Sequence, residues 1–163
     1  MDTLPPLPGP LPWPVPDSRA HHVAGDYWDM HAIVEELVLP AHAPASVTSV
    51  LETSRELIRH SYYRYEFTTV AVAFSLFALE AALATHLSSK KPLQQLIDLA
   101  AARNVISEDL RERLQYGREI RNKLSHGKTT AAALTPAMAV PMVRAVFDTA
   151  ALLYPDPAEP PAS

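Results

Sequence analysis

Cysteine is absent from the 163-residue chain, so neither a disulfide framework nor a thiolate metal site can form. Glycine is scarce, with only four residues, and the sequence has no glycine-rich phosphate loop, nucleophile elbow or His-Glu-x-x-His pattern. These absences exclude common signatures of nucleotide-binding proteins, serine hydrolases and metalloproteases. Seven histidines remain as possible bases or ligands.

The chain also lacks a long uninterrupted apolar segment. The longest uncharged apolar run, residues 67–79, has 13 residues, which is too short to span a bilayer and typical of a buried core helix. The N-terminus has no basic region followed by an apolar stretch, so we expect no secretory signal. We therefore expect a cytoplasmic protein with no membrane partner.

Neither sign of charge dominates the whole chain, whose net charge is −4, but basic residues gather in one segment. Between residues 103 and 128 there are seven basic residues (Arg103, Arg111, Arg113, Arg118, Arg121, Lys123 and Lys128) and four acidic ones (Glu108, Asp109, Glu112 and Glu119). This local surplus is compatible with a phosphate-bearing ligand. A solvated helix face of mixed charge explains it equally well.

Proline marks the two ends of the chain. Seven of the 16 prolines lie in residues 1–16 and four in residues 155–161. We therefore predict Pro-rich tails, extended or disordered, at 1–25 and 155–163, around a single domain at 26–154. The N-terminal run could be a ligand for SH3-type domains, although a stiff tail without a partner explains it as well.

The sequence between the tails has helical periodicity and no convincing strand alternation. We expect helices at 26–39, 46–61, 63–87, 93–103, 108–124 and 135–154, which together predict an all-α bundle. The segment 63–87 is apolar nearly all round and should lie at the centre. Ser107 is a good N-cap, Gly127 suits a left-handed helix end, and Pro141 should kink the last helix or delay its start.

One arginine falls on the buried side of the fifth predicted helix. On an ideal helical wheel, Leu110, Leu114, Gly117, Ile120 and Leu124 form the core-facing stripe, and Arg121 lies in its middle. A charged side chain there is costly unless it is paired or reaches a wet cleft.

His126 ends the same helix and lies four residues after Asn122. Histidine titrates near neutrality, and a helix C-terminus favours a cation. An arginine to stabilise a phosphate and a histidine to move protons suit metal-independent phosphodiester chemistry. The alternative is structural: Arg121 would pair with a carboxylate such as Glu80, and His126 would cap the last carbonyl groups.

The stretch "IRNKLSHG" at 120–127 has the form Arg-Asn-x-x-x-His-Gly and resembles the R-x4-6-H motif of the HEPN superfamily of helical bundles. The motif has the expected place, near the end of a long helix that one more helix follows, and "FSLFALEAAL" is similar to an earlier HEPN helix that often carries an acidic residue. The resemblance covers residues 63–154. It implies a HEPN-like fold and, since many members are ribonucleases of toxin–antitoxin or phage-defence systems, a metal-independent endoribonuclease without a cofactor.

The resemblance also implies roles for particular residues. Arg121 would stabilise the scissile phosphate, and His126 would act as general acid or base while the RNA 2′-hydroxyl attacks. Asn122 would orient the phosphate or His126, and Glu80 would be the acidic partner. Further candidates for the site are Arg118, Ser125, Glu66 and Lys128.

The resemblance further implies a homodimer in which two motifs share one cleft, with RNA as substrate and an antitoxin or regulatory protein as a possible partner. Some HEPN toxins carry a tyrosine two residues after the motif histidine, where an antitoxin modifies them. This chain has Lys128 there, which argues against that kind of pairing. Because some HEPN domains are not catalytic, a non-catalytic dimerisation or ligand-sensing module is the alternative function.

Two other clusters have simpler explanations. Tyr62, Tyr63 and Tyr65, with Arg59 and Arg64, could stack on bases, but tyrosines at the start of a helix are more often packing residues. The irregularly spaced set of His21, His22, Asp26 and His31 could suggest a metal site, but the spacing does not favour one.

Overall fold

The chain forms a bundle of α-helices in the computed structural model, which describes residues 13–127 and 134–156. The elements are a short 3₁₀ helix η1 (Ala20–His22) and the α-helices α1 (Tyr27–Glu35), α2 (Ala45–His60), α3 (Phe67–His86), α4 (Leu93–Ala102), α5 (Glu108–Ser125) and α6 (Pro136–Leu153). The described ranges contain no strand. The predicted all-α class is confirmed.

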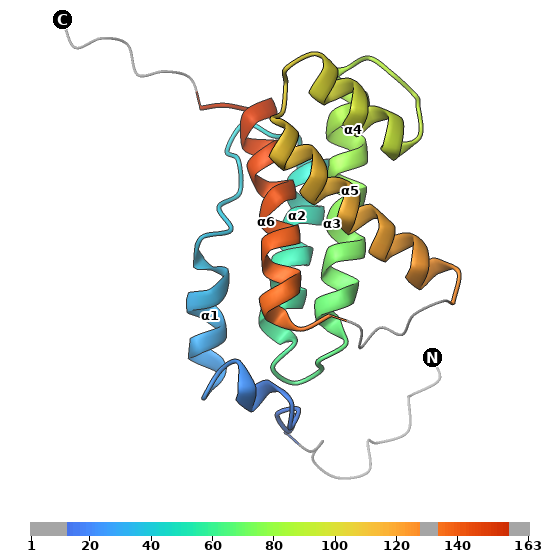
Figure 1. Ribbon diagram of the computed structural model, residues 1–163. Helices are drawn as coiled ribbons and strands as arrows, with labels where there is room; N and C mark the ends of the chain where they lie inside the picture. The colour runs from blue at the N-terminus through green and yellow to red at the C-terminus, as the bar shows by residue number, and fades with distance from the viewer. Residues whose placement is uncertain (1–12, 128–133, 157–163) are drawn as a thin grey trace, which may run out of the picture.

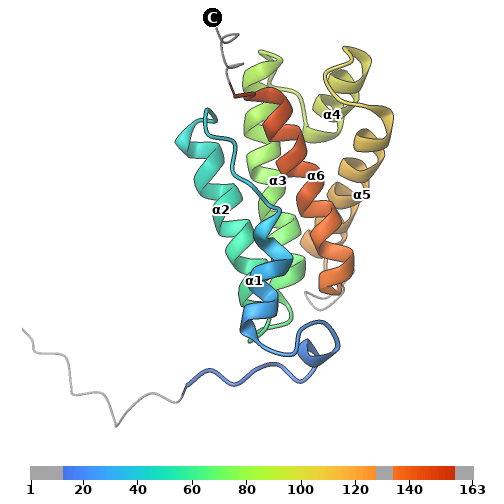
Figure 2. The same cartoon turned by 90° about the vertical axis from the view of Figure 1, so that its left-hand side faces the viewer.

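Helices α2, α3 and α6 run side by side as the centre of the bundle (Figures 1 and 2). Helix α1 packs against α2 on one side, while α4 and α5 cover part of α3 on the other. By length and composition alone, α3 and α6 could each cross a membrane. Here they are core helices, with half or more of their most apolar windows buried inside the bundle.

Most helix boundaries follow from local chemistry. The Ser107 hydroxyl accepts a hydrogen bond from the Leu110 amide at 3.2 Å, and Thr135 does the same for Met138 at 3.3 Å, so both side chains satisfy amides that have no partner within their helix. At the end of α5, Gly127 adopts φ +65°, where glycine carries no steric penalty. The predicted caps of α5 are therefore confirmed. Pro141 lies inside α6 without delaying its start at Pro136.

Helix α3 begins four residues later than the sequence predicts. Residues 61–66 form a turn, and the first residue of α3 is Phe67. One side of α3 is fully buried, but its opposite side is half-buried or exposed, with Phe77 52% exposed. The prediction that this helix lies at the centre of the bundle agrees with its packing against α2 and α6, although part of its surface remains exposed.

A cluster of charges ties the N-terminal segment to the bundle. Arg19 donates to Asp17 at 2.7 Å and to Glu66 at 2.7 Å, and its guanidinium lies 4.6 Å from the centre of the Tyr65 ring. The Asp17 amide donates to the Tyr62 carbonyl at 2.9 Å. Together with buried Ala20, these contacts make residues 17–25 part of the folded domain, whereas the sequence assigned them to the tail.

The Asp17 carboxyl provides a pH-dependent prediction. Its pKa lies well below the usual range, chiefly because Arg19 donates hydrogen bonds to the carboxylate. A lowered folded-state pKa contributes stability above about pH 4, the ordinary pKa of aspartate, and loses it as the pH falls toward the folded value. Asp17→Asn should therefore lower the free energy of unfolding at pH 6, and this difference should shrink at pH 3 in urea titrations.

Asp109→Asn is the control, because that carboxylate forms an exposed ion pair with Arg113 on the same helix. Its effect should be small at both pH values. An Asp17→Asn difference of equal size at pH 6 and pH 3 would contradict the assignment.

Buried hydroxyls fix the position of α6 against α3. The Thr68 hydroxyl donates to the Leu134 carbonyl at 2.8 Å, and the Leu134 amide donates to the Thr69 hydroxyl at 3.2 Å. All three residues are buried. Unpaired polar groups would be costly at this depth, so the pair of threonines determines where the chain enters α6 after α5.

Candidate functional site

Arg121 lies at the edge of the bundle, on the last part of α5. Its guanidinium Nη1 is 3.6 Å from Oε2 of Glu80 on α3. The Arg121 side chain is 22% exposed and that of Glu80 is 42% exposed, so the pair is partly solvated. The structure therefore brings together the arginine that the sequence placed on the buried stripe and the carboxylate expected to meet it.

The crossing of α5 over α3 explains this half-buried position. Leu110, Leu114 and Gly117 are buried, and a Cβ atom on Gly117 would lie 3.8 Å from a Val72 methyl group. Beyond this close approach, the C-terminal half of α5 extends away from the other helices (Figure 1). Ile120 and Leu124, predicted on the core-facing stripe, are consequently only half-buried.

His126 is the C-cap residue of α5 and is exposed. Its amide donates to the Asn122 carbonyl at 3.1 Å, after which Gly127 turns the chain out of the helix. Side chains five residues apart diverge by about 140° around a helix, so the imidazole and the Arg121 guanidinium leave α5 in different directions. Within the described residues, no hydrogen bond joins them.

The supporting candidates share α5 with Arg121. Arg118 donates through Nε to the Gln115 side chain at 2.7 Å, and the Ser125 hydroxyl donates to the Arg121 carbonyl at 2.9 Å. Asn122 is half-buried beside Arg121. These residues give one flank of the projecting helix hydrogen-bonding capacity and the positive charge of Arg118.

Two other candidates do not join this set. Glu66 precedes α3 and binds Arg19 at 2.7 Å and Arg64 at 3.3 Å, and these hydrogen bonds and charges lower its pKa. It therefore belongs to the N-terminal cluster rather than to the environment of Arg121. Lys128 lies outside the described residues.

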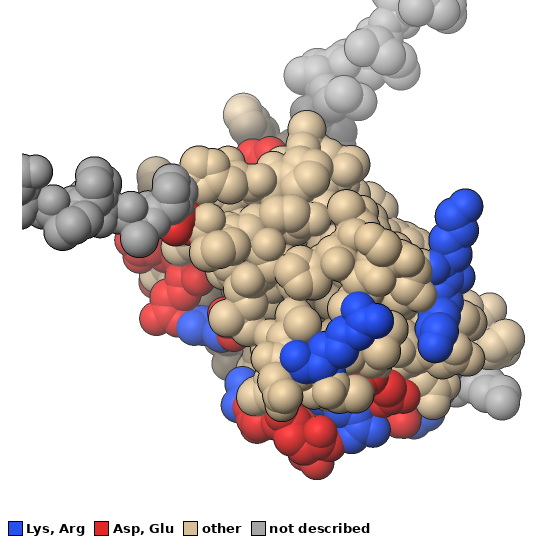
Figure 3. Space-filling model, turned by 90° about the horizontal axis from the view of Figure 1, so that it is seen from above, with Lys and Arg blue, Asp and Glu red and all other residues tan. Residues whose placement is uncertain are grey.

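Ion pairs engage three of the basic residues of the segment 103–128, two of them with carboxylates from outside it, Asp98 and Glu80. Arg111 binds Asp98 at 2.8 Å as well as Glu108, Arg113 binds Asp109 at 2.8 Å, and Arg121 meets Glu80. The end of the bundle that carries α4 is mostly uncharged, with basic and acidic side chains mixed at its rim (Figure 3). Neither observation indicates a broad basic surface at this end of the bundle.

The histidines and tyrosines near the N-terminus have structural positions. Asp26 caps α1, accepting from the Trp28 amide at 2.8 Å, and the described residues contain no group of three or more potential ligands placed to hold a metal. The Tyr27 ring lies 5.4 Å from that of Tyr63 and 5.7 Å from that of His60. These contacts fit packing between α1 and the α2–α3 turn.

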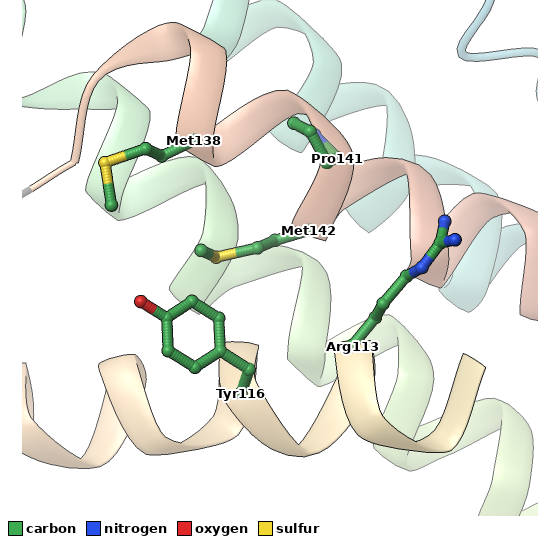
Figure 4. A pocket seen from close by; sticks show the side chains of 5 residues that line it. All are labelled: Arg113, Tyr116, Met138, Pro141 and Met142. Atoms are coloured by element: carbon green, nitrogen blue, oxygen red, sulfur yellow. The ribbon is translucent and has the colours of Figure 1, made fainter. Parts of the chain in front are cut away.

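An apolar groove of about 330 Å³, which was not predicted from the sequence, lies between α5 and α6. Tyr116 and Arg113 line it from α5, while Met138, Pro141 and Met142 line it from α6 (Figure 4). The spacing of Met138 and Met142, one helical turn apart, was the available signal. Arg113 and Tyr116 are the titratable residues among those that line the groove, and the others are apolar. The groove therefore resembles a binding surface more than a catalytic site.

Comparison with protein families, with curated proteins and with solved structures gives no match for this chain.

Proposed function

We propose that this protein is a metal-independent endoribonuclease of the HEPN type, acting in the cytoplasm as a toxin or phage-defence effector. The observation that carries the proposal is the placement of Arg121 at a partly solvated edge, next to Glu80, on the helix that ends in exposed His126. An arginine sealed in a dry interior could not meet RNA, whereas the Arg121 side chain is 22% exposed. This exposure supports the proposal that a phosphate reaches the guanidinium.

The proposed reaction needs no group beyond these side chains and the RNA. His126 takes the proton of the 2′-hydroxyl, and the 2′-oxygen attacks the adjacent phosphorus. The bond from phosphorus to the 5′-oxygen breaks, and a second imidazolium returns a proton to that oxygen. The products are a 2′,3′-cyclic phosphate and a 5′-hydroxyl. Arg121 stabilises the negative charge that develops on the phosphate oxygens, while Glu80 and Asn122 keep the guanidinium and the phosphate oriented.

Two chains are part of this proposal. The side chains of Arg121 and His126 leave α5 in different directions, so those of a single chain do not point toward the same phosphate. A homodimer in which Arg121 of one chain works beside His126 of the other removes this difficulty. It also supplies two histidines, one to accept and one to donate a proton.

Incubating the purified protein with mixed RNA in EDTA tests the proposal. We expect cleavage products that end in cyclic phosphate, and we expect His126→Ala to reduce the rate by about 10²–10⁴-fold. His86→Ala is the matched control. His86 is an exposed histidine in the last turn of α3, as His126 is an exposed histidine at the C-cap of α5. Equal cleavage by the wild type and His126→Ala, or none by either at micromolar enzyme, would refute the proposal.

The alternative function is a non-catalytic helical module for dimerisation or ligand sensing. The observation in its favour is the contact between Arg121 and Glu80, which resembles a structural ion pair. The apolar groove between α5 and α6 would then be a binding surface. Complete absence of RNA cleavage from a folded protein would favour this function.

A further inference from the structure

The outer side of α3 is apolar although it is not fully covered. Six apolar residues occupy it: Val70, Ala73, Phe74, Phe77, Ala81 and Ala84. On a helical wheel they cover an arc of about 100° and none carries a charge. Phe77 is 52% exposed, Ala81 is exposed and the other four are half-buried. A helix that faces water normally carries polar side chains on that side, so this surface is built to be covered.

Five of the six residues are arranged symmetrically about Phe77; the counterpart of the sixth, Phe74, is Glu80 at the edge of the face. Ala73 and Ala81 lie four residues to either side of it, and Val70 and Ala84 lie seven residues to either side. A second α3 running antiparallel would therefore bring Ala73 of one copy to the level of Ala81 of the other, with the two Phe77 rings meeting at the centre. Two-fold interfaces require such self-complementarity. The small alanines let the helices approach closely while the phenylalanines supply apolar area.

We propose that this face docks a second copy of the chain, with a two-fold axis passing next to Phe77 and the two α3 helices antiparallel. The face, 15 residues long, extends about 22 Å along the helix. A stable interface buries about 800 Å² per partner, more than one helix face supplies. The projecting half of α5 meets α3 at Glu80 on one flank, and α2 meets it at Ala71 on the other, so both neighbouring helices can add area.

This arrangement has a consequence for the candidate site, and that consequence rests on the proposed function. Glu80 lies one turn beyond Phe77 and about 60° to one side of the face. An antiparallel two-fold axis keeps both Glu80–Arg121 pairs on the same flank, separated by roughly 9 Å along the helix direction. Both projecting α5 ends would then border one cleft. A parallel pairing would instead place the two pairs on opposite flanks.

The oligomeric state of the full chain tests the docking surface without reference to RNA. Sedimentation of the wild type should give twice the 17.9 kDa of one chain. Phe77→Glu should raise the dissociation constant at least about 30-fold, the effect of removing a central anchor residue. Leu152→Glu is the matched control, because Leu152 is 56% exposed on α6 and lies outside the face; its dissociation constant should be unchanged. A monomeric wild type at 100 μM, or a dimer insensitive to Phe77→Glu, would overturn the proposal.

Cross-linking tests whether the two α3 helices are antiparallel. Because the chain has no native cysteine, only the introduced cysteines can react. With a short bis-maleimide, a mixture of Ala73→Cys and Ala81→Cys chains should cross-link efficiently, while each variant alone should not. Efficient cross-linking of either variant with itself would overturn the antiparallel arrangement. Both alanines are small and on the surface of α3, so folding should persist, as circular dichroism can verify.

The two proposals fail in different ways. A dimer of the predicted register without RNA cleavage removes the ribonuclease and leaves the interface. Cleavage by a protein that remains monomeric removes the interface and leaves the ribonuclease.

Discussion

Arg121→Met is expected to reduce RNA cleavage by about 10²–10³-fold while the protein remains folded, because the variant loses the charge that stabilises the phosphate. The pair with Glu80 is 3.6 Å long and partly solvated. Pairs of this kind contribute about 0–1 kcal/mol to stability. The methionine stem retains most of the apolar contact of the arginine stem, so urea unfolding should move by no more than that amount.

Arg113→Met provides the control for this experiment. Arg113 forms a 2.8 Å ion pair with Asp109 on the same helix but points toward the groove with α6. Its loss should have a similarly small effect on stability and none on cleavage. If Arg121→Met unfolded the protein, the arginine would be structural, and the alternative of a non-catalytic module would be favoured.

Leu114→Ala is expected to be the most destabilising of the single substitutions considered, at about 2–5 kcal/mol. Leu114 is 1% exposed and anchors α5 against the bundle before the crossing at Gly117. Removing its side chain leaves a cavity that the surrounding helices can only partly fill. Since domains of this size are stable by about 5–15 kcal/mol, the loss should be evident as a lower midpoint in urea unfolding.

Leu124→Ala is the comparison that makes this test informative. Leu124 belongs to the same helix and the same predicted stripe, but it is half-buried in the projecting half of α5. We expect its loss to be clearly smaller than that of Leu114→Ala. Equal losses would mean that the end of α5 is packed as tightly as its beginning, which contradicts the geometry on which the exposure of Arg121 depends.

Local sequence patterns predicted much of the fold. The hydroxyl of Ser107 and the backbone freedom of Gly127 act within one helical turn, so the ends of α5 could be inferred without knowing what surrounds them. The predicted helices agree with the six observed ones apart from shifts at their ends, the largest at the end of α1 and the start of α3. At the start of α3, residues 61–66 form a turn that Asp17 contacts through the Tyr62 carbonyl.

The candidate site could be predicted only in part. The helical wheel identified Arg121 as an arginine on the buried side of its helix, and the structural alternative named Glu80 as a carboxylate that could pair with it, as it does. The wheel could not show that α5 projects past α3, because the length of contact between two helices depends on their crossing. The cluster of Asp17, Arg19 and Glu66 was missed because it joins residues 47 positions apart along the chain.

By itself, the order of residues determined that this chain is helical and where most of its helices begin and end, since caps, prolines and the 3.6-residue period act over a few residues. It also determined that a guanidinium would leave α5 on the side of the core. Only the tertiary structure decided that the Arg121 guanidinium lies at a partly solvated edge of the bundle and that one uncharged face of α3 is not fully buried. The physical reason is that exposure is a property of how helices cross and where one ends beside another, and no single helix contains that information.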